Sequence, residues 1–243
     1  MRVGVYVDGF NLYYGGRGIC GRSIKGWKWL DIRALSIALI KNHSHWQNVS
    51  LERVVFCTAR VSGAFDQDGQ HRQDVYLRAL KLYNSVDEIS FGNYVSRISL
   101  APLATPNKKG KPQITKPSWP IMIKTGLGGD DPSAVFMASV ARREEKGSDV
   151  NVASHLLIDV IDKRIDAALI ISNDSDLAFP IKSMRSRVPV GMINPTASQT
   201  AGRLKGTPMD GVGGHWWARL GASELFESQL PQNFGGLTKP AHW

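Results

Sequence analysis

The chain has 243 residues, of which 42% are hydrophobic, so it can bury a substantial core in one domain with additions or in two small domains. Its formal net charge of +9 attracts polyanions, and nucleic acid is the partner that we expect; the alternative is a charge that serves solubility alone. No run of ~18 apolar residues occurs, so we expect no membrane span.

The N-terminal half alternates between predicted strands and helices. Residues 3–7 form a continuous apolar run, as expected for a strand that is covered on both faces. A loop rich in glycine and aromatic residues is expected after it. The next predicted elements are a helix over Leu30–Lys41, a strand over Leu51–Thr58, a helix over Asp66–Leu82, and two shorter strands, Glu88–Val95 and Arg97–Leu103, that could form a hairpin.

The same N-terminal residues bear on the compartment. Because they lead directly into a buried strand, no secretory signal is expected. The two cysteines, Cys20 and Cys57, do not make a disulfide framework or a metal knuckle. We therefore expect a cytoplasmic protein with reduced thiols.

Residues 102–132 differ in composition from the rest of the chain. They hold half of its 12 prolines, which disfavours a helix there. They are also basic, with lysines at Lys108, Lys109, Lys111, Lys116 and Lys124. We expect a partly extended insertion whose lysines contact phosphate groups, or else a solvated loop that the lysines keep soluble.

The C-terminal half returns to alternating elements. The predicted order is a strand over Ala134–Val140, a helix over Val150–Lys163, a strand over Ala167–Ile171, a helix over Asp174–Arg187 and a strand over Val188–Ile193. This alternation favours an α/β layer fold with a mainly parallel sheet. Residues 195–243 are expected to form an extension that packs on the domain of residues 1–194, with an apolar patch over His215–Leu220 and a last element over Ser223–Leu230.

Acidic residues follow two of the predicted buried strands. Asp8 comes directly after the first strand, and Asp174 and Asp176 come after Ala167–Ile171. Because ligands of parallel sheets bind where the carboxyl ends of strands meet, these carboxylates are expected at one edge. Asp149, just before a predicted helix, would join them if that helix packs across the same edge. Such a cluster of like charges is stable mainly with a bound divalent cation, and oxygen ligands favour Mg²⁺ or Mn²⁺.

Each acidic residue also has a purely structural interpretation. Asp8 could form a turn with the glycine that follows it. Asp149 could be an ordinary helix N-cap. Asp174 and Asp176 could be first-turn acids that interact with the helix dipole. The metal-site interpretation explains all four residues at once, whereas the structural one needs separate coincidences at one sheet edge.

Three segments then stand out together: Val7-Asp8-Gly9-Phe10-Asn11-Leu12-Tyr13, Glu145-Lys146-Gly147-Ser148-Asp149-Val150 and Ser172-Asn173-Asp174-Ser175-Asp176-Leu177. Their order and spacing resemble the signature segments of NYN domains, a branch of the PIN-like nucleases. The resemblance covers about residues 2–194, and residues 227–231 resemble the LabA-like branch. It implies a PIN-like, Rossmannoid three-layer fold, cleavage of RNA that depends on Mg²⁺ or Mn²⁺, and metal ligation by the four aspartates.

The resemblance also assigns a role to Asn11, which matches a polar residue that helps to position the metal site or the substrate. Two departures, Asn173 where many relatives have glycine and Leu177 where phenylalanine is common, remove no ligand. The expected chemistry is phosphodiester hydrolysis, with a metal-activated water attacking in line. Asp176 could hold a second metal or orient the water. Lys146 could neutralise charge on the phosphate, or be a solvated surface lysine.

A substrate track needs phosphate contacts and aromatic surfaces for bases. Tyr13, Tyr14 and Arg17 follow the first acidic motif and could line such a groove. Trp27 and Trp29 lie in a basic segment and could contact RNA, although a tryptophan is more often part of the core. Single-stranded or structured RNA is the expected partner, and the chain could form a homodimer.

Other functions stay open at this point. The chain could be a non-catalytic RNA- or partner-binding module of the same fold, although all four aspartates are present. It could be a DNA-directed nuclease, which composition does not separate from a ribonuclease. A small-molecule phosphohydrolase is disfavoured by the basic charge and by the absence of an Asp-x-Asp pair after the first strand.

Overall fold

A computed structural model describes residues 1–64, 66–241 and 243 of the chain. It divides into two compact units. The main unit comprises Met1–Tyr94 and Glu145–Trp243, and the inserted unit comprises Val95–Glu144. No helix in the described residues is long and apolar enough to cross a membrane.

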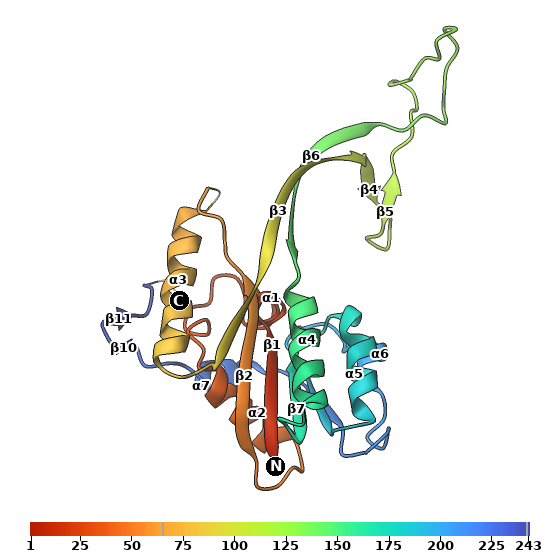
Figure 1. Ribbon diagram of the computed structural model, residues 1–243. Coiled ribbons are helices and arrows are strands. Elements are labelled where there is room, and N and C mark those ends of the chain that lie inside the picture. Colours follow the sequence, from red (N-terminus) through yellow and green to blue (C-terminus); the bar gives the residue numbers. More distant parts are fainter. Residues whose placement is uncertain (65, 242) are drawn as a thin grey trace. The chain divides into compact units, whose positions relative to one another are not determined.

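A seven-stranded sheet runs through the described chain, in the order β6-β3-β2-β1-β7-β8-β9 (Figure 1). Five neighbouring pairs in this order are parallel: β3–β2, β2–β1, β1–β7, β7–β8 and β8–β9. Their bounds are Arg2–Asp8 for β1, Ser50–Ala59 for β2, Glu88–Pro102 for β3, Met137–Lys146 for β6, Ala167–Ile171 for β7, Val190–Asn194 for β8 and Trp216–Arg219 for β9. The predicted α/β class with a mainly parallel sheet is therefore confirmed.

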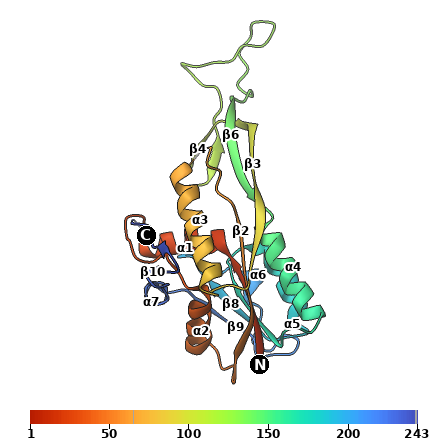
Figure 2. The same ribbon diagram turned by 60° about the vertical axis from the view of Figure 1, so that its left-hand side comes forward.

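Helices cover both faces of this sheet and make it a three-layer, Rossmann-like fold (Figure 2). Side chains of β1 alternate between the two cores, since Val3, Val5 and Val7 belong to one cluster and Tyr6 to the other. The first core takes residues of α1 (Gly9–Cys20), α2 (Ile32–His43), α3 (Gln67–Leu82) and α7 (Ala222–Glu227). The second takes residues of α4 (Ser148–Ile161), α5 (Ala178–Arg185) and α6 (Gly202–Lys205).

The helix α1 was not predicted, because a glycine- and aromatic-rich segment resembles a loop in isolation. In the structure, other parts of the chain pack so closely against two of its glycines that a side chain would not fit there. A β-carbon on Gly15 would lie 2.1 Å from the carbonyl oxygen of Pro195, and one on Gly16 would lie 2.7 Å from the ring of Trp27. Trp27 and Trp29 are 1% and 0% exposed, so the interpretation of these two tryptophans as RNA contacts is wrong. Tertiary packing outweighs the low helix propensity of glycine here.

Three other elements differ from the prediction. The chain from Glu88 to Pro102 is a single strand, β3, and not two short strands joined as a hairpin. The strand expected over Ala134–Val140 begins and ends later, at Met137–Lys146, so only two residues separate its last paired residue from Asp149. The helix predicted from Asp174 starts with a 3-10 turn, Ser175–Leu177, before α5.

The inserted unit is extended, as its prolines predict. Within it, β4 (Ala104–Pro106) pairs antiparallel with β5 (Pro112–Ile114). Lys108, Lys109 and Lys111 lie at the turn between these strands and are exposed. Packing therefore does not require these three lysines.

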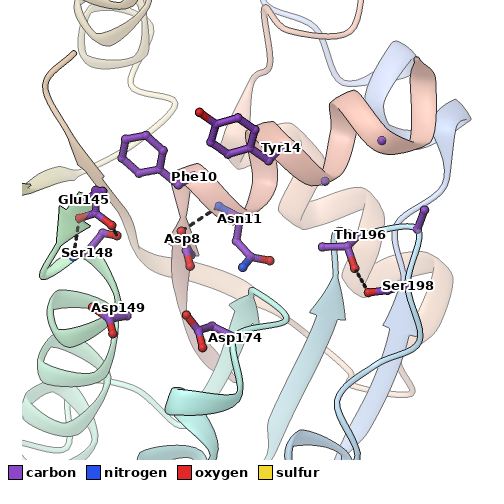
Figure 3. Close-up of a pocket in the computed structure, with 13 residues that line it drawn as sticks. Asp8, Phe10, Asn11, Tyr14, Glu145, Ser148, Asp149, Asp174, Thr196 and Ser198 are labelled. Carbon is purple, nitrogen blue, oxygen red and sulfur yellow. Dashed lines mark hydrogen bonds between the residues drawn. The ribbon is translucent and has the colours of Figure 1, made fainter. Parts of the chain in front are cut away.

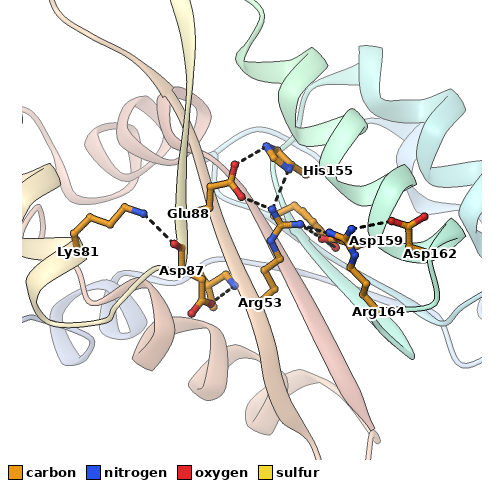
Figure 4. Close-up of polar contacts among 10 residues, drawn as sticks. Arg53, Lys81, Asp87, Glu88, His155, Asp159, Asp162 and Arg164 are labelled. Atoms are coloured by element: carbon orange, nitrogen blue, oxygen red, sulfur yellow. Dashed lines mark hydrogen bonds and ion pairs between the residues drawn. The ribbon is translucent and has the colours of Figure 1, made fainter.

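A network of charged and polar side chains fixes α4 on the sheet (Figure 4). Asp159 of α4 is 0% exposed and accepts hydrogen bonds from the Tyr6 hydroxyl at 2.9 Å and from Arg53 Nη1 at 2.6 Å. Arg53 also pairs with Glu88, which lies 3.5 Å from the His155 ring. Burial and the neighbouring Asp159 raise the pKa of Tyr6, so it remains a hydrogen-bond donor. The buried carboxylate is thus fully compensated, and the helix is held in one register against β1 and β2.

Candidate functional site

Four acidic residues surround one pocket at the carboxyl edge of the sheet (Figure 3). Asp8 is the last residue of β1, and Asp174 follows the end of β7 by three residues. Glu145 lies near the end of β6, and Asp149 lies in the first turn of α4. The pocket has a volume of about 490 Å³. Three of the four predicted aspartates therefore line one cavity, as their positions at strand ends and a helix start suggested.

Asp8 is the most buried of these acids, with 4% of its surface exposed. Its Oδ1 accepts a hydrogen bond from the Asn11 backbone N–H at 2.9 Å and so caps α1, and its Oδ2 accepts one from the Ser172 hydroxyl at 3.2 Å. Burial raises the pKa of Asp8 to about 6, and the negative charges of Asp174 and Glu145 add to the rise. Asp8 thus caps α1, but its buried position beside other acidic residues disfavours its ionised form.

Ser172 connects Asp8 with Asp174. Its hydroxyl donates to Asp8 and accepts a hydrogen bond from the Asp174 backbone N–H at 3.1 Å. Asp174 in turn accepts a hydrogen bond from the Asp176 backbone N–H at 3.0 Å, which caps the 3-10 turn. Asp176 itself is exposed and does not line the pocket. Its metal-binding role stays a prediction.

The turn between β6 and α4 positions Glu145 and Asp149. Gly147 has φ of +94°, a left-handed conformation that favours glycine, and it is the N-cap of α4. Asp149 is therefore not the N-cap, and the structural interpretation of this residue as a cap is wrong. The Ser148 backbone N–H and hydroxyl donate to Glu145 at 3.0 and 2.8 Å, so Glu145 provides the capping oxygens instead. Asp149 is left to line the pocket.

The opposite wall of the pocket is formed by Thr196, Ala197 and Ser198. The Asn173 amide nitrogen donates to Thr196 Oγ1 at 3.3 Å, to Ser198 Oγ at 3.3 Å and to the Gln199 carbonyl at 3.2 Å. Its Oδ1 accepts from the Ala201 backbone N–H at 2.9 Å. Asn173 therefore has a structural use: together with Asn194, which also bonds to Thr196 and Ser198, it holds the loop that follows β8.

We expect Asn173→Ala to destabilise the protein by about 1 to 2 kcal/mol, since several neutral hydrogen bonds are lost at a half-buried site. Urea unfolding measures this change. Gln199→Ala is the control, because the exposed Gln199 side chain is truncated while the carbonyl that Asn173 uses is kept. Equal stability of Asn173→Ala and the parent protein would mean that water replaces the amide without cost.

Asn11 also lines the pocket, and its Oδ1 accepts a hydrogen bond from the Asn173 backbone N–H at 3.0 Å. This contact ties α1 to the segment after β7. Asn11 thus positions the segment that carries Asp174, whatever else it contacts in a complex.

Tyr14, one of the residues expected to line a substrate groove, lines the pocket, whereas the other residues predicted to bind nucleic acid do not. Tyr13 is 39% exposed and packs against Trp27, with ring centroids 5.8 Å apart. Arg17 lies in the last turn of α1, and Lys146 is the exposed last residue of β6. Lys108, Lys109 and Lys111 belong to the inserted unit. Their role in binding stays a prediction.

Several lining residues were not predicted as site residues. Glu145 lies inside a quoted signature segment, and its acidic side chain four residues before Asp149 was a signal that could have identified it. Phe10 also lies inside a signature segment. Thr196, Ala197 and Ser198 follow β8 in a loop with no motif, so only the folded chain reveals that they reach the pocket.

The donor set is made of carboxylate oxygens, which suit a hard divalent cation. Yet among the residues that the structure describes, no three acidic, histidine or cysteine side chains lie close enough to hold one ion as they stand. The expected sharing of one cation by Asp8, Asp149 and Asp174 is not formed in this arrangement. Asp8 and Asp174 each accept a backbone hydrogen bond at one carboxylate oxygen, from Asn11 and Asp176 respectively.

Comparisons with known proteins add one relative and one structure. No family model matches the chain. The chain is 28% identical over 265 aligned positions to the enzyme 6-hydroxy-3-succinoylpyridine 3-monooxygenase of Pseudomonas putida, and the match covers all of this chain and 75% of that protein. A crystal structure of a protein of unknown function from Vibrio parahaemolyticus has a TM-score of 0.45 and 15% identity, covering 90% of this chain and 92% of the other.

Proposed function

We propose that this protein is a divalent-metal-dependent ribonuclease that hydrolyses phosphodiester bonds. The observation that supports the proposal is the convergence of Asp8, Glu145, Asp149 and Asp174 on one pocket in a chain of net charge +9. An acidic pocket repels a polyanion such as RNA unless bound cations offset its charge. The rest of the chain is basic and attracts a polyanion. The resemblance to NYN domains in three signature segments points to the same chemistry.

A cation, Mg²⁺ or Mn²⁺, would be held by Asp8, Asp149 and Asp174, with Glu145 as a further oxygen donor that the structure suggests. When bound, it would supply charge stabilisation at the phosphate and a more acidic water. The chain's own part is to present these carboxylates from separate elements, two of them joined by the Ser172 hydroxyl. Binding would favour ionised Asp8, whose pKa of about 6 in the free pocket reflects burial.

The direct test incubates the purified protein with 5′-labelled RNA and with DNA of the same sequence. Each substrate is incubated with Mn²⁺, with Mg²⁺ and with chelator. Cleavage of RNA that requires a divalent cation is the expected result. Faster cleavage of DNA would instead assign a DNA-directed nuclease, and binding of RNA without cleavage under any condition would assign a non-catalytic module.

The lysines at the β4–β5 turn give a separate prediction. We expect Lys108, Lys109 and Lys111 replaced together by alanine to weaken RNA binding and to flatten its salt dependence by about 2 in the log–log slope, at roughly 0.7 per lost phosphate contact. The cleavage rate at saturating protein should barely change, since these residues do not line the acidic pocket. Anisotropy titrations at several salt concentrations measure the slope.

The control for this experiment removes three lysines from the main unit: Lys41, Lys182 and Lys205. It changes the net charge equally. If both triple variants flatten the slope to the same extent, the effect is one of overall charge and the inserted unit does not touch RNA.

A second candidate, hydroxylation of a small pyridine ring, is favoured by the similarity to the Pseudomonas monooxygenase across the whole chain. It requires O₂ and two electrons from a donor, with one oxygen atom entering the ring and the other leaving as water. Incubation with 6-hydroxy-3-succinoylpyridine, O₂ and a reduced nicotinamide, followed by product analysis, tests it. Turnover of the pyridine together with an absence of RNA cleavage would replace the ribonuclease proposal.

A further inference from the structure

Aromatic side chains gather on the α1 side of the acidic pocket. Phe10 and Tyr14, one helical turn apart on α1, both line the pocket, and Figure 3 shows their rings on the same side of it, close to Asp8 and Asn11. Their ring centroids are 6.3 Å apart with an angle of 21° between the planes, which is a stacked pair. Tyr94, from β3, meets the edge of Phe10 at 5.7 Å.

This group is too exposed to be explained as core. Tyr14 is 57% exposed and Tyr94 is 39% exposed, whereas Trp27 and Trp29 in the neighbouring core are 1% and 0% exposed. The Tyr14 ring meets Phe10 and the edge of Tyr13. More than half of its surface is therefore left to solvent. An aromatic ring left open on the wall of a polar pocket is suited to receive a planar ring of a ligand.

The position of Tyr14 relative to the acidic residues of the pocket indicates which kind of ligand ring it would receive. Tyr14 lies six residues after Asp8, about 9 Å along the axis of α1 at ~1.5 Å per residue. A polynucleotide whose phosphate lies at the acidic pocket therefore carries a base within reach of Tyr14. Base–aromatic stacking tolerates any base, because every base has a π-face.

We propose that Tyr14, backed by Phe10, stacks on a base next to the scissile phosphate, so that the substrate is single-stranded RNA. This rests on the ribonuclease proposed above. The bases of a duplex are stacked on one another and cannot present a face to Tyr14 without being displaced. Tyr14 is on this view a positioning residue that selects unpaired nucleotides, and the acids carry out the chemistry.

The test measures binding with Ca²⁺ in place of Mn²⁺ or Mg²⁺, so that a divalent cation can offset the charge of the acidic pocket, and gel analysis of the same samples checks that the RNA stays intact. Three fluorescent RNAs are compared: a single strand, the same strand in a duplex, and the same strand with its bases removed at successive positions. The parent protein should bind the base-bearing strand about 10-fold more tightly than the abasic strand, a difference of about 1.4 kcal/mol. Tyr14→Ala should lose about 10-fold on the base-bearing strand and nothing on the abasic strand, and Tyr14→Phe should restore binding.

Tyr83→Ala is the control, because Tyr83 is 43% exposed but does not line the pocket. Unchanged binding of Tyr14→Ala, an equal loss on both strands, or no RNA binding by the parent protein would each overturn the stacking proposal. Cleavage is read separately with Mn²⁺. If Tyr14→Ala weakens binding but the parent protein does not cleave RNA, Tyr14 remains a base-stacking residue and the ribonuclease proposal is overturned. If the parent protein cleaves RNA but Tyr14→Ala does not change binding, the ribonuclease proposal remains and the stacking proposal is overturned. Saturable binding of a free hydroxypyridine in place of RNA would also overturn it and favour the second candidate function.

Discussion

Replacing Asp174 by asparagine is expected to abolish cation-dependent cleavage of RNA while leaving the protein at least as stable. The loss of rate should be about 100-fold or more, the size typical of removing a group that acts at the reacting atoms. Asparagine keeps an oxygen that can accept the Asp176 backbone N–H, so the 3-10 turn remains capped. Removing one of several like charges also relieves repulsion in the metal-free pocket.

The matched control is Asp68→Asn, an exposed first-turn aspartate of α3 that does not line the pocket. Cleavage rates with Mn²⁺ and melting curves in chelator are compared for both variants. Full activity of Asp174→Asn would remove this residue from the mechanism. A melting temperature that falls sharply would show that its carboxylate is structural.

Asp8→Asn is expected to stabilise the metal-free protein at neutral pH by on the order of 2 to 3 kcal/mol. Burial raises the pKa of Asp8 to about 6 from an ordinary value of 3.8, and each unit corresponds to about 1.4 kcal/mol. Below about pH 3 the carboxyl is mostly protonated in both the folded and the unfolded chain, so its ionisation costs little there. As pH rises from about 3 to somewhat above 6, the unfolded chain ionises first, and folding becomes less favourable by the full amount.

The gain in the asparagine variant should therefore be nearly absent near pH 3 and nearly complete above about pH 6. Denaturant unfolding across this range in chelator measures it, with Asp68→Asn again as the control. A gain that is the same at every pH would trace to packing and not to the charge of Asp8. If Mn²⁺ binds at Asp8, adding it should stabilise the parent protein more than the variant, because a ligand that binds the folded state alone stabilises it.

The parallel core of the fold was predictable because its strands are continuous apolar runs, and a strand buried on both faces requires such a run. Val3–Val7 and Ala167–Ile171 were placed within a residue of their observed ends, and the acids that follow them could be assigned to one sheet edge. The helix α1 could not be predicted, because Gly15 and Gly16 are explained only by Pro195 and Trp27, far away in sequence.

The candidate site was predictable to the same degree. Acids directly after strands are fixed by the sheet, so Asp8 and Asp174 reach the pocket. Asp176, two residues later, lies in a 3-10 turn, is exposed and does not line the pocket, and the sequence alone did not separate it from Asp174. Residues 196–198 line the pocket and are held partly by hydrogen bonds from Asn173, which is more than 20 residues away in the sequence. No local sequence pattern predicts such contacts.

The inserted unit leaves and rejoins the main unit at neighbouring points. A β-carbon on Gly92, near the exit, would lie 2.5 Å from the carbonyl oxygen of Lys146, near the return. The intervening segment thus spans almost no distance, and the free-energy cost of a longer or shorter one grows only with the logarithm of its length. A segment of different length or sequence could therefore replace residues 95–144 without moving the ends of β3 and β6 that lie in the main unit, and so without moving the four acids that line the pocket.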